Sequence, residues 1–109
     1  MSEPASFTSS IAARYALAVF EIAQEADQVT ELEKNIDVLS EALDVSEDLN
    51  AMLKSPLLSR GAQGQAIAAV AAKLGLSEDL SNTLALMASK RRLFVVPGLI
   101  GQLRALISE

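Results

Sequence analysis

The feature that most constrains the fold is a repeated spacing of three and four residues between large apolar side chains. Residues 28–43 and 93–107 both carry it, and in the first of them polar and charged residues fill most positions between the apolar ones. Side chains spaced in this way lie on one face of an α-helix. Both segments are therefore predicted to be helices with one buried face. Their apolar positions are Val29, Leu32, Ile36, Leu39 and Leu43, and Leu93, Val96, Ile100, Leu103 and Ile107.

The rest of the composition also favours helices. The 109 residues include only five glycines and three prolines, alanine and leucine dominate, and β-branched residues form no alternating run. Such a composition suits helices better than strands. A chain of this length makes one domain. We predict an all-α fold, a six-helix bundle in a single domain.

Capping residues and helix breakers place the ends of these helices. Ser46, Ser59 and Ser77 each precede a helical pattern and can accept a hydrogen bond from a first-turn N–H. Pro97 is expected in the first turn of the last helix. Residues 1–8 lack periodicity and are predicted to be a flexible tail before a bundle over 9–109. The other expected helices cover about 9–27, 28–43, 46–54, 60–74 and 77–90, and the last runs through Ile107.

The first and fifth helices carry more apolar side chains than one buried face needs. Successive residues on a helix turn by about 100°, so positions two apart lie on nearly opposite sides. By this rule each helix has two stripes, and each is either central in the bundle or contacted by a partner. The stripes are Ile11, Tyr15, Ala18 and Ile22 against Ala13, Leu17 and Phe20, and Leu80, Leu84 and Met87 against Asn82, Thr83 and Leu86.

Catalytic and metal-binding functions have little support in the sequence. Cysteine and histidine are both absent, which removes the usual thiolate nucleophile, the commonest general base and the commonest metal ligand. The candidate carboxylates are Glu21 with Glu25, and the pairs 47–48 and 78–79. They are explained by a solvated helix face and by two helix starts, where the dipole favours acids. We expect no enzyme activity, no metal and no cofactor.

Nucleic-acid and membrane functions are also disfavoured. The net charge is −5, and nonspecific nucleic-acid affinity requires the neutralisation of phosphates. The cluster Lys90-Arg91-Arg92 is interpreted as a basic turn at a helix end, with nucleic-acid binding kept as a weaker alternative. The apolar run from Leu93 to Gly101 is nine residues long, whereas a membrane span needs about twenty. A helix lying on the bilayer surface stays open, and the lack of a signal peptide predicts a cytoplasmic, bacterial protein.

Three segments together resemble a known family. They are "ARYALAVFEIA" (13–23), "LKSPLLSR" (53–60) and "NTLALMASKRRLFVVPGLIGQL" (82–103). In this order and spacing they are similar to the N-terminal domain of the δ subunit of bacterial F-type ATP synthase, the counterpart of the mitochondrial oligomycin-sensitivity-conferring protein. The resemblance implies a six-helix bundle without catalytic activity.

The resemblance also implies a place in an assembly. It predicts a peripheral-stalk, or stator, domain that grips the N-terminal helix of an α subunit in a groove between the first and fifth helices. It predicts that the b subunits are held by a C-terminal domain, which we expect to be absent from this chain. The complex would lie at the cytoplasmic face of the bacterial inner membrane, with no direct insertion of this chain.

The family pattern assigns the groove to particular residues. The tyrosine of its Arg-Tyr-Ala pattern is Tyr15, and a small residue one turn later is Ala18. Thr83 is more polar than the aliphatic residue often found there. The alternatives are that these side chains only pack in the fold, or that the chain is a generic adaptor for another amphipathic helix. The predicted partner-binding groove comprises Ile11, Tyr15, Ala18, Ile22, Asn82, Thr83 and Leu86.

Overall fold

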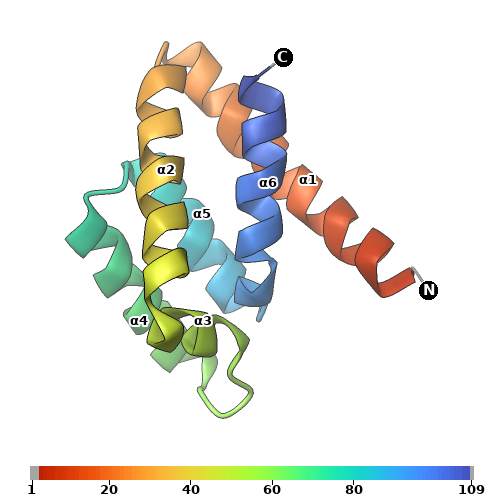
Figure 1. The fold of residues 1–109 in the computed structure, drawn as a ribbon, viewed down its shortest axis with the longest axis vertical. Coiled ribbons are helices and arrows are strands. Elements are labelled where there is room, and N and C mark those ends of the chain that lie inside the picture. Colours follow the sequence, from red (N-terminus) through yellow and green to blue (C-terminus); the bar gives the residue numbers. More distant parts are fainter. Residues whose placement is uncertain (1–2, 109) are drawn as a thin grey trace.

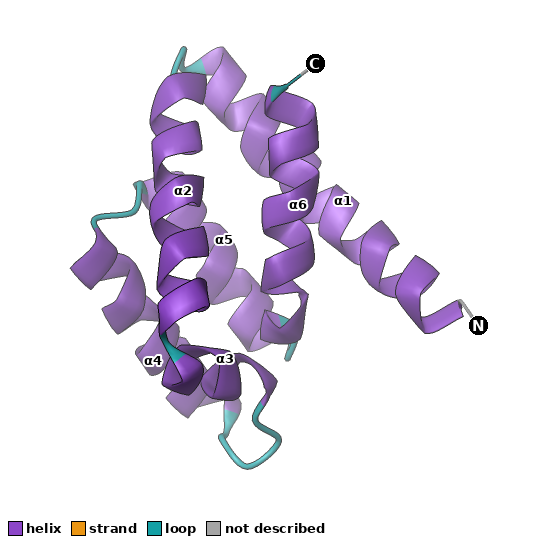
Figure 2. Cartoon of the chain, in the orientation of Figure 1, coloured by secondary structure: helices purple, strands orange, loops and turns teal. Residues whose placement is uncertain are grey.

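The chain folds into helices joined by short connections. The computed structural model describes residues 3–108, with side chains from Ser9 to Ser108, and this range contains no strand (Figure 2). The all-α, six-helix prediction is thereby confirmed. The helices are α1 (Glu3–Glu25), α2 (Val29–Val45), α3 (Glu47–Lys54), α4 (Arg60–Leu74), α5 (Glu78–Ser89) and α6 (Val96–Ile107), with one 3-10 turn, η1 (Leu93–Val95), before α6.

The helices pack in two layers around a shared core. In Figure 1, α2 and α6 lie side by side at the front, with α1 and α5 behind them. α6 makes its most extensive contact with α1, and α4 packs along α5. α3 and the loop that follows it lie at the lower end (Figure 1). None of the described helices has the length and hydropathy needed to cross a membrane.

The helix ends follow the predicted chemistry at most boundaries. The hydroxyls of Ser46, Ser59 and Ser77 accept hydrogen bonds from N–H groups three residues later, at 3.1, 3.0 and 3.3 Å. Each bond satisfies an N–H that has no partner inside its helix. Gly75 ends α4 in the left-handed conformation with φ 70°, where a glycine has no Cβ to clash. Pro97 lies in the first turn of α6.

The start of α1 differs from the prediction. Residues 1–8 were expected to form a flexible tail, but the backbone is helical from Glu3 onward. Residues 1–2 lie outside the described part of the chain. Pro4 does not prevent the helix, because its missing N–H falls in the first turn, where no intrahelical acceptor exists. The first turns of α1 extend beyond the other helices (Figure 1).

The core confirms the predicted inner faces of α2, α5 and α6 but not that of α1. The two predicted stripes of α1 lie on either side of the buried one, which consists mostly of alanines. Small side chains there let α6 approach closely, and a Cβ added at Gly98 would lie 3.3 Å from the Cβ of Ala12. The buried positions of α1 are Ile11, Ala12, Ala16, Val19 and Ala23.

Candidate functional site

The predicted groove residues lie along the contact between α1 and α5. Near the C-terminal end of α1, Val19 and Ala23 line a cavity of about 10 Å³ together with Asp79 in the first turn of α5. Two turns earlier, midway along α1, the Tyr15 hydroxyl accepts a hydrogen bond from Arg92, which follows the C-terminal end of α5. The two helices therefore run antiparallel, and we call this contact the α1–α5 seam.

Two large apolar side chains at the seam are half exposed. Leu86 is 47% exposed and Ile22 is 45% exposed. Leu86 follows Asp79 by seven residues, two helical turns, so it lies on the side of α5 that faces α1. Ile22 precedes Ala23 and follows Tyr15 by seven residues, which places it on the flank of α1 beside α5. Apolar side chains therefore stay accessible on both helices of the seam.

The other predicted residues divide into accessible and buried ones. Ala18 and Asn82 are exposed, and Tyr15 and Thr83 are partly buried. Ile11 is only 6% exposed and belongs to the hydrophobic core. Ile11 therefore packs in the core and offers little surface to a partner.

Hydrogen bonds fix the polar groups at the seam. Arg92 donates from Nη1 to the Tyr15 hydroxyl at 3.3 Å, and the Tyr15 ring packs against the core. The Thr83 hydroxyl donates to the carbonyl of Asp79 at 2.9 Å. The polarity of Thr83 is thus satisfied within α5, which lessens its conflict with the aliphatic residue of the family pattern. The contact of Arg92 was missed by sequence reasoning, because 77 residues separate the partners.

The basic cluster after α5 is largely used inside the fold. Arg91 donates to the carbonyl of Leu58 and to Oε1 of Gln63, and Arg92 donates to Tyr15. Two of the three cations thus join distant parts of the chain. This arrangement favours the interpretation as a structural basic turn over a phosphate-binding patch.

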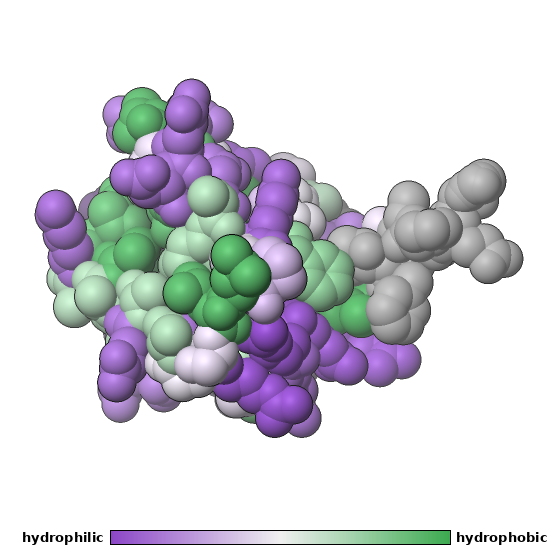
Figure 3. All heavy atoms as spheres, turned by 90° about the horizontal axis from the view of Figure 1, so that it is seen from below, coloured by the Kyte–Doolittle hydropathy of each residue, from purple (hydrophilic) through white to green (hydrophobic). Residues whose placement is uncertain are grey.

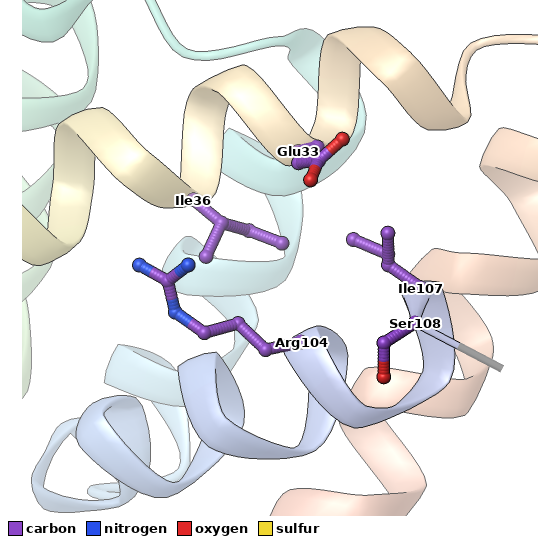
Figure 4. A pocket seen from close by; sticks show the side chains of 5 residues that line it. All are labelled: Glu33, Ile36, Arg104, Ile107 and Ser108. Atoms are coloured by element: carbon purple, nitrogen blue, oxygen red, sulfur yellow. The ribbon is translucent and has the colours of Figure 1, made fainter.

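The hollow between α2 and α6 does not provide catalytic chemistry. It has a volume of about 360 Å³, and Figure 4 shows Glu33 and Ile36 of α2 across from side chains of α6. Arg104, which lines it, forms an exposed ion pair with Asp37 at 3.0 Å, and such pairs contribute about 0–1 kcal/mol. The lining has no nucleophile with a general base beside it. Ile107 and Ser108 complete it.

The candidate carboxylates do not converge on a metal or catalytic site. The side chains of Glu21 and Glu25 are exposed on α1. The pairs 47–48 and 78–79 occupy the first turns of α3 and α5, as predicted. Among the residues with described side chains, no group of three potential ligands could hold a metal ion.

Comparison with known proteins identifies the family. The family described as "ATP synthase delta (OSCP) subunit" matches residues 11–109, a range that includes the whole seam. The chain belongs to the ATP synthase delta (OSCP) subunit family. The resemblance noted in the sequence is therefore confirmed.

Several bacterial relatives are similar over the full length of this chain. The ATP synthase subunit delta of Ruegeria sp. (strain TM1040) is 57% identical over 109 residues. The subunits of the same name from Roseobacter denitrificans and Rhodobacter capsulatus are 53% and 52% identical. In each case the chain spans 59% of the length of the relative.

Proposed function

We propose that this chain is a non-catalytic domain of the peripheral stalk of a bacterial F-type ATP synthase. In this role it holds the N-terminal helix of an α subunit along the α1–α5 seam and so links the catalytic head to the stalk. Membership of the delta (OSCP) family supports the stalk role. The observation that carries the binding site is the pair of half-exposed side chains, Ile22 and Leu86, on the two antiparallel helices.

The physical basis is the docking of an amphipathic helix. A partner helix with an apolar stripe would cover Ile22 and Leu86 and so remove apolar surface from water. Ala18 lies one helical turn before Ile22 on the same flank of α1, and its small side chain would allow the partner backbone to come close. Tyr15, held by Arg92, adds a rigid aromatic surface at one end.

The wider assembly follows the family pattern. The b subunits would be held by the C-terminal domain that this pattern includes, and the complex would lie at the cytoplasmic face of the inner membrane. The chain would then act as a mechanical connection with no cofactor or metal of its own. Exposed ion pairs contribute little binding free energy. We therefore expect the affinity for the α-subunit helix to come mainly from apolar side chains buried on both helices of the seam.

The decisive experiment is a calorimetric titration of the 109-residue chain with a synthetic peptide of the first twenty or so residues of the α subunit from the same organism. We expect saturable one-to-one binding. Leu86→Asp and Tyr15→Asp should each weaken it by at least about 2 kcal/mol, as expected for central anchor residues. Leu86→Asp should change the melting temperature of the free chain only slightly, since the Leu86 side chain is half exposed in the absence of a partner.

A matched control separates the seam from the rest of α1. Leu17 is 47% exposed, as Leu86 is, but lies on the opposite side of α1. Leu17→Asp should therefore leave the affinity unchanged. Equal losses with Leu17→Asp and Leu86→Asp would contradict the assignment to the seam. Equal affinity for an unrelated amphipathic helix would instead favour a generic adaptor.

A further inference from the structure

A second apolar surface lies at the lower end of the molecule in Figure 1, where α3, the loop that follows it and η1 meet. Leu57, in the loop between α3 and α4, is 92% exposed, and Phe94 of η1 is half exposed. A hollow of about 230 Å³ is lined by Phe94 together with Leu53, Pro56 and Leu93, and Leu57 follows Pro56 in the loop. Figure 3 looks onto this end and shows apolar residues bordered by hydrophilic ones. We call Leu57, Phe94 and the hollow the Leu57 surface.

The loop that presents Leu57 is held in place by buried and bonded groups. Gln63 is the buried polar residue of the described core, and its Nε2 donates to the carbonyls of Met52 and Ser55 at 3.3 and 3.4 Å. Arg91 donates to the carbonyl of Leu58. These hydrogen bonds hold the backbone on both sides of Leu57, whose side chain stays exposed to solvent.

Arg91 itself adopts an unusual backbone conformation at this brace. Its φ is 58°, in the left-handed region that residues other than glycine seldom occupy. The same residue bonds to Oε1 of Gln63 at 3.4 Å. The conformation follows from the end of α5, where the N–H groups of Arg91 and Arg92 donate to the carbonyls of Ala88 and Met87, as in the usual left-handed helix ending.

The sequence segments that form the Leu57 surface carry only positive charges. No Asp or Glu occurs between Leu49 and Ser77, or between Leu80 and Ser108. Lys54, which lines the hollow, ends α3, and Arg60 begins α4, so both flank the loop; both side chains are exposed. Lys90 precedes Arg91 at the end of α5 and is exposed too. An acidic partner would meet these cations without a competing carboxylate from the same segments.

We propose that the Leu57 surface binds an acidic peptide segment of a partner protein that carries at least one large apolar side chain. The hollow is smaller than the roughly 300–1,000 Å³ typical of sites for drug-sized molecules, so it suits a side chain. Apolar contact with Leu57 and Phe94 would give affinity, and the cations would select an acidic sequence. The proposal is independent of the α1–α5 seam, since the two surfaces share no residue.

Three octapeptides test this directly against the 15N-labelled chain by amide chemical-shift mapping. The first is DEEFLEED, the second has Ser-Ser in place of Phe-Leu, and the third has lysine at every acidic position. We expect the first to shift amides within 54–58 and 93–94, and the other two to bind at least about fivefold more weakly. Binding of the second peptide as strong as that of the first would overturn the proposal, because charge alone would then explain it.

Substitutions locate the contact. Leu57→Ser should weaken binding of DEEFLEED about tenfold, and Lys54→Glu should weaken it as well. The matched control is Val38→Ser, because Val38 is 39% exposed midway along α2, whereas α3 follows the end of that helix. Unchanged binding with Leu57→Ser would overturn the proposal. Phosphatidylglycerol vesicles that perturb these amides while DEEFLEED does not would also overturn it, in favour of a membrane contact.

Discussion

α1 and α2 bury their inner faces in different ways. α2 uses large aliphatic side chains, Leu32, Ile36 and Leu39, each almost fully buried. α1 uses alanines at three of its five buried positions, of which Ala12 and Ala16 are fully buried. Small side chains allow α6 to lie close against α1, and the large side chains of α1 are then left on its flanks. The core side of α1 thus consists mostly of small residues, and its flanks keep larger ones exposed.

The largest expected effect is a cavity in the face of α2. Ile36→Ala should lower the free energy of unfolding by about 3 kcal/mol, because a buried Ile→Ala change loses transfer energy and leaves a void. Ile36 is 1% exposed. Urea unfolding followed by circular dichroism at 222 nm measures the loss. A change below about 1 kcal/mol would mean that the face of α2 can collapse around the void.

The matching test on α1 is overpacking. Ala12→Leu should lower the free energy of unfolding by about 2 kcal/mol, because extra methylenes in a close contact force side chains and backbone apart. The control is Ala18→Leu on the exposed flank of the same helix, which should change stability by less than about 0.5 kcal/mol. Similar unfolding midpoints for both variants would show that α6 does not pack closely on α1.

This difference explains what the sequence could and could not predict. Large aliphatic residues at spacings of three and four define the inner faces of α2 and α6, and on α5 the stripe of larger side chains is the buried one. The inner face of α1 consists largely of alanine, which contrasts little with neighbouring apolar residues. Periodicity therefore selected the larger side chains on either side of it. The same ambiguity placed Ile11 in the predicted groove, although it lies in the core.

Contacts between distant segments could not be predicted from the sequence for another reason. The bond between Arg92 and Tyr15 and the brace formed by Gln63 and Arg91 join helices whose relative placement is set by the whole core. A local pattern has no signal for such pairs. By contrast, the three serine caps are local, and they were predicted correctly. The exposed positions at the seam were identified by surplus apolar residues and by the family resemblance together.

The next largest effect is a loss of peptide affinity on substitution of an exposed residue of α1, compared with an exposed residue of α2. Ile22 on α1 and Val38 on α2 are both exposed aliphatic residues. Ile22→Asp should weaken binding of the α-subunit peptide by about 1.5 kcal/mol, since it lies at the seam, whereas Val38→Asp should have no effect. Calorimetry with the same peptide measures both. A loss with Val38→Asp of the same size would mean that the peptide binds through α2 as well.

The smallest effect concerns two glycines of α6 that face different surroundings. A Cβ at Gly101 would meet nothing within 4 Å, so Gly101→Ala should raise the free energy of unfolding by about 0.5–1 kcal/mol through reduced backbone entropy of the unfolded chain. A Cβ at Gly98 would lie 3.3 Å from Ala12, and this tight contact should offset part of the gain. Thermal unfolding of both variants measures the difference.

A double-mutant cycle assigns that difference to the contact between α1 and α6. Gly98→Ala should be more favourable in an Ala12→Gly background than in the native chain, because the opposing Cβ is then gone. If the two effects are additive, the crowding at Gly98 does not come from Ala12, and the close approach of α6 has another cause. If they couple, the small side chains of α1 admit α6, and this accounts for the position of the large side chains of α1, Leu17 and Ile22, on its exposed flanks.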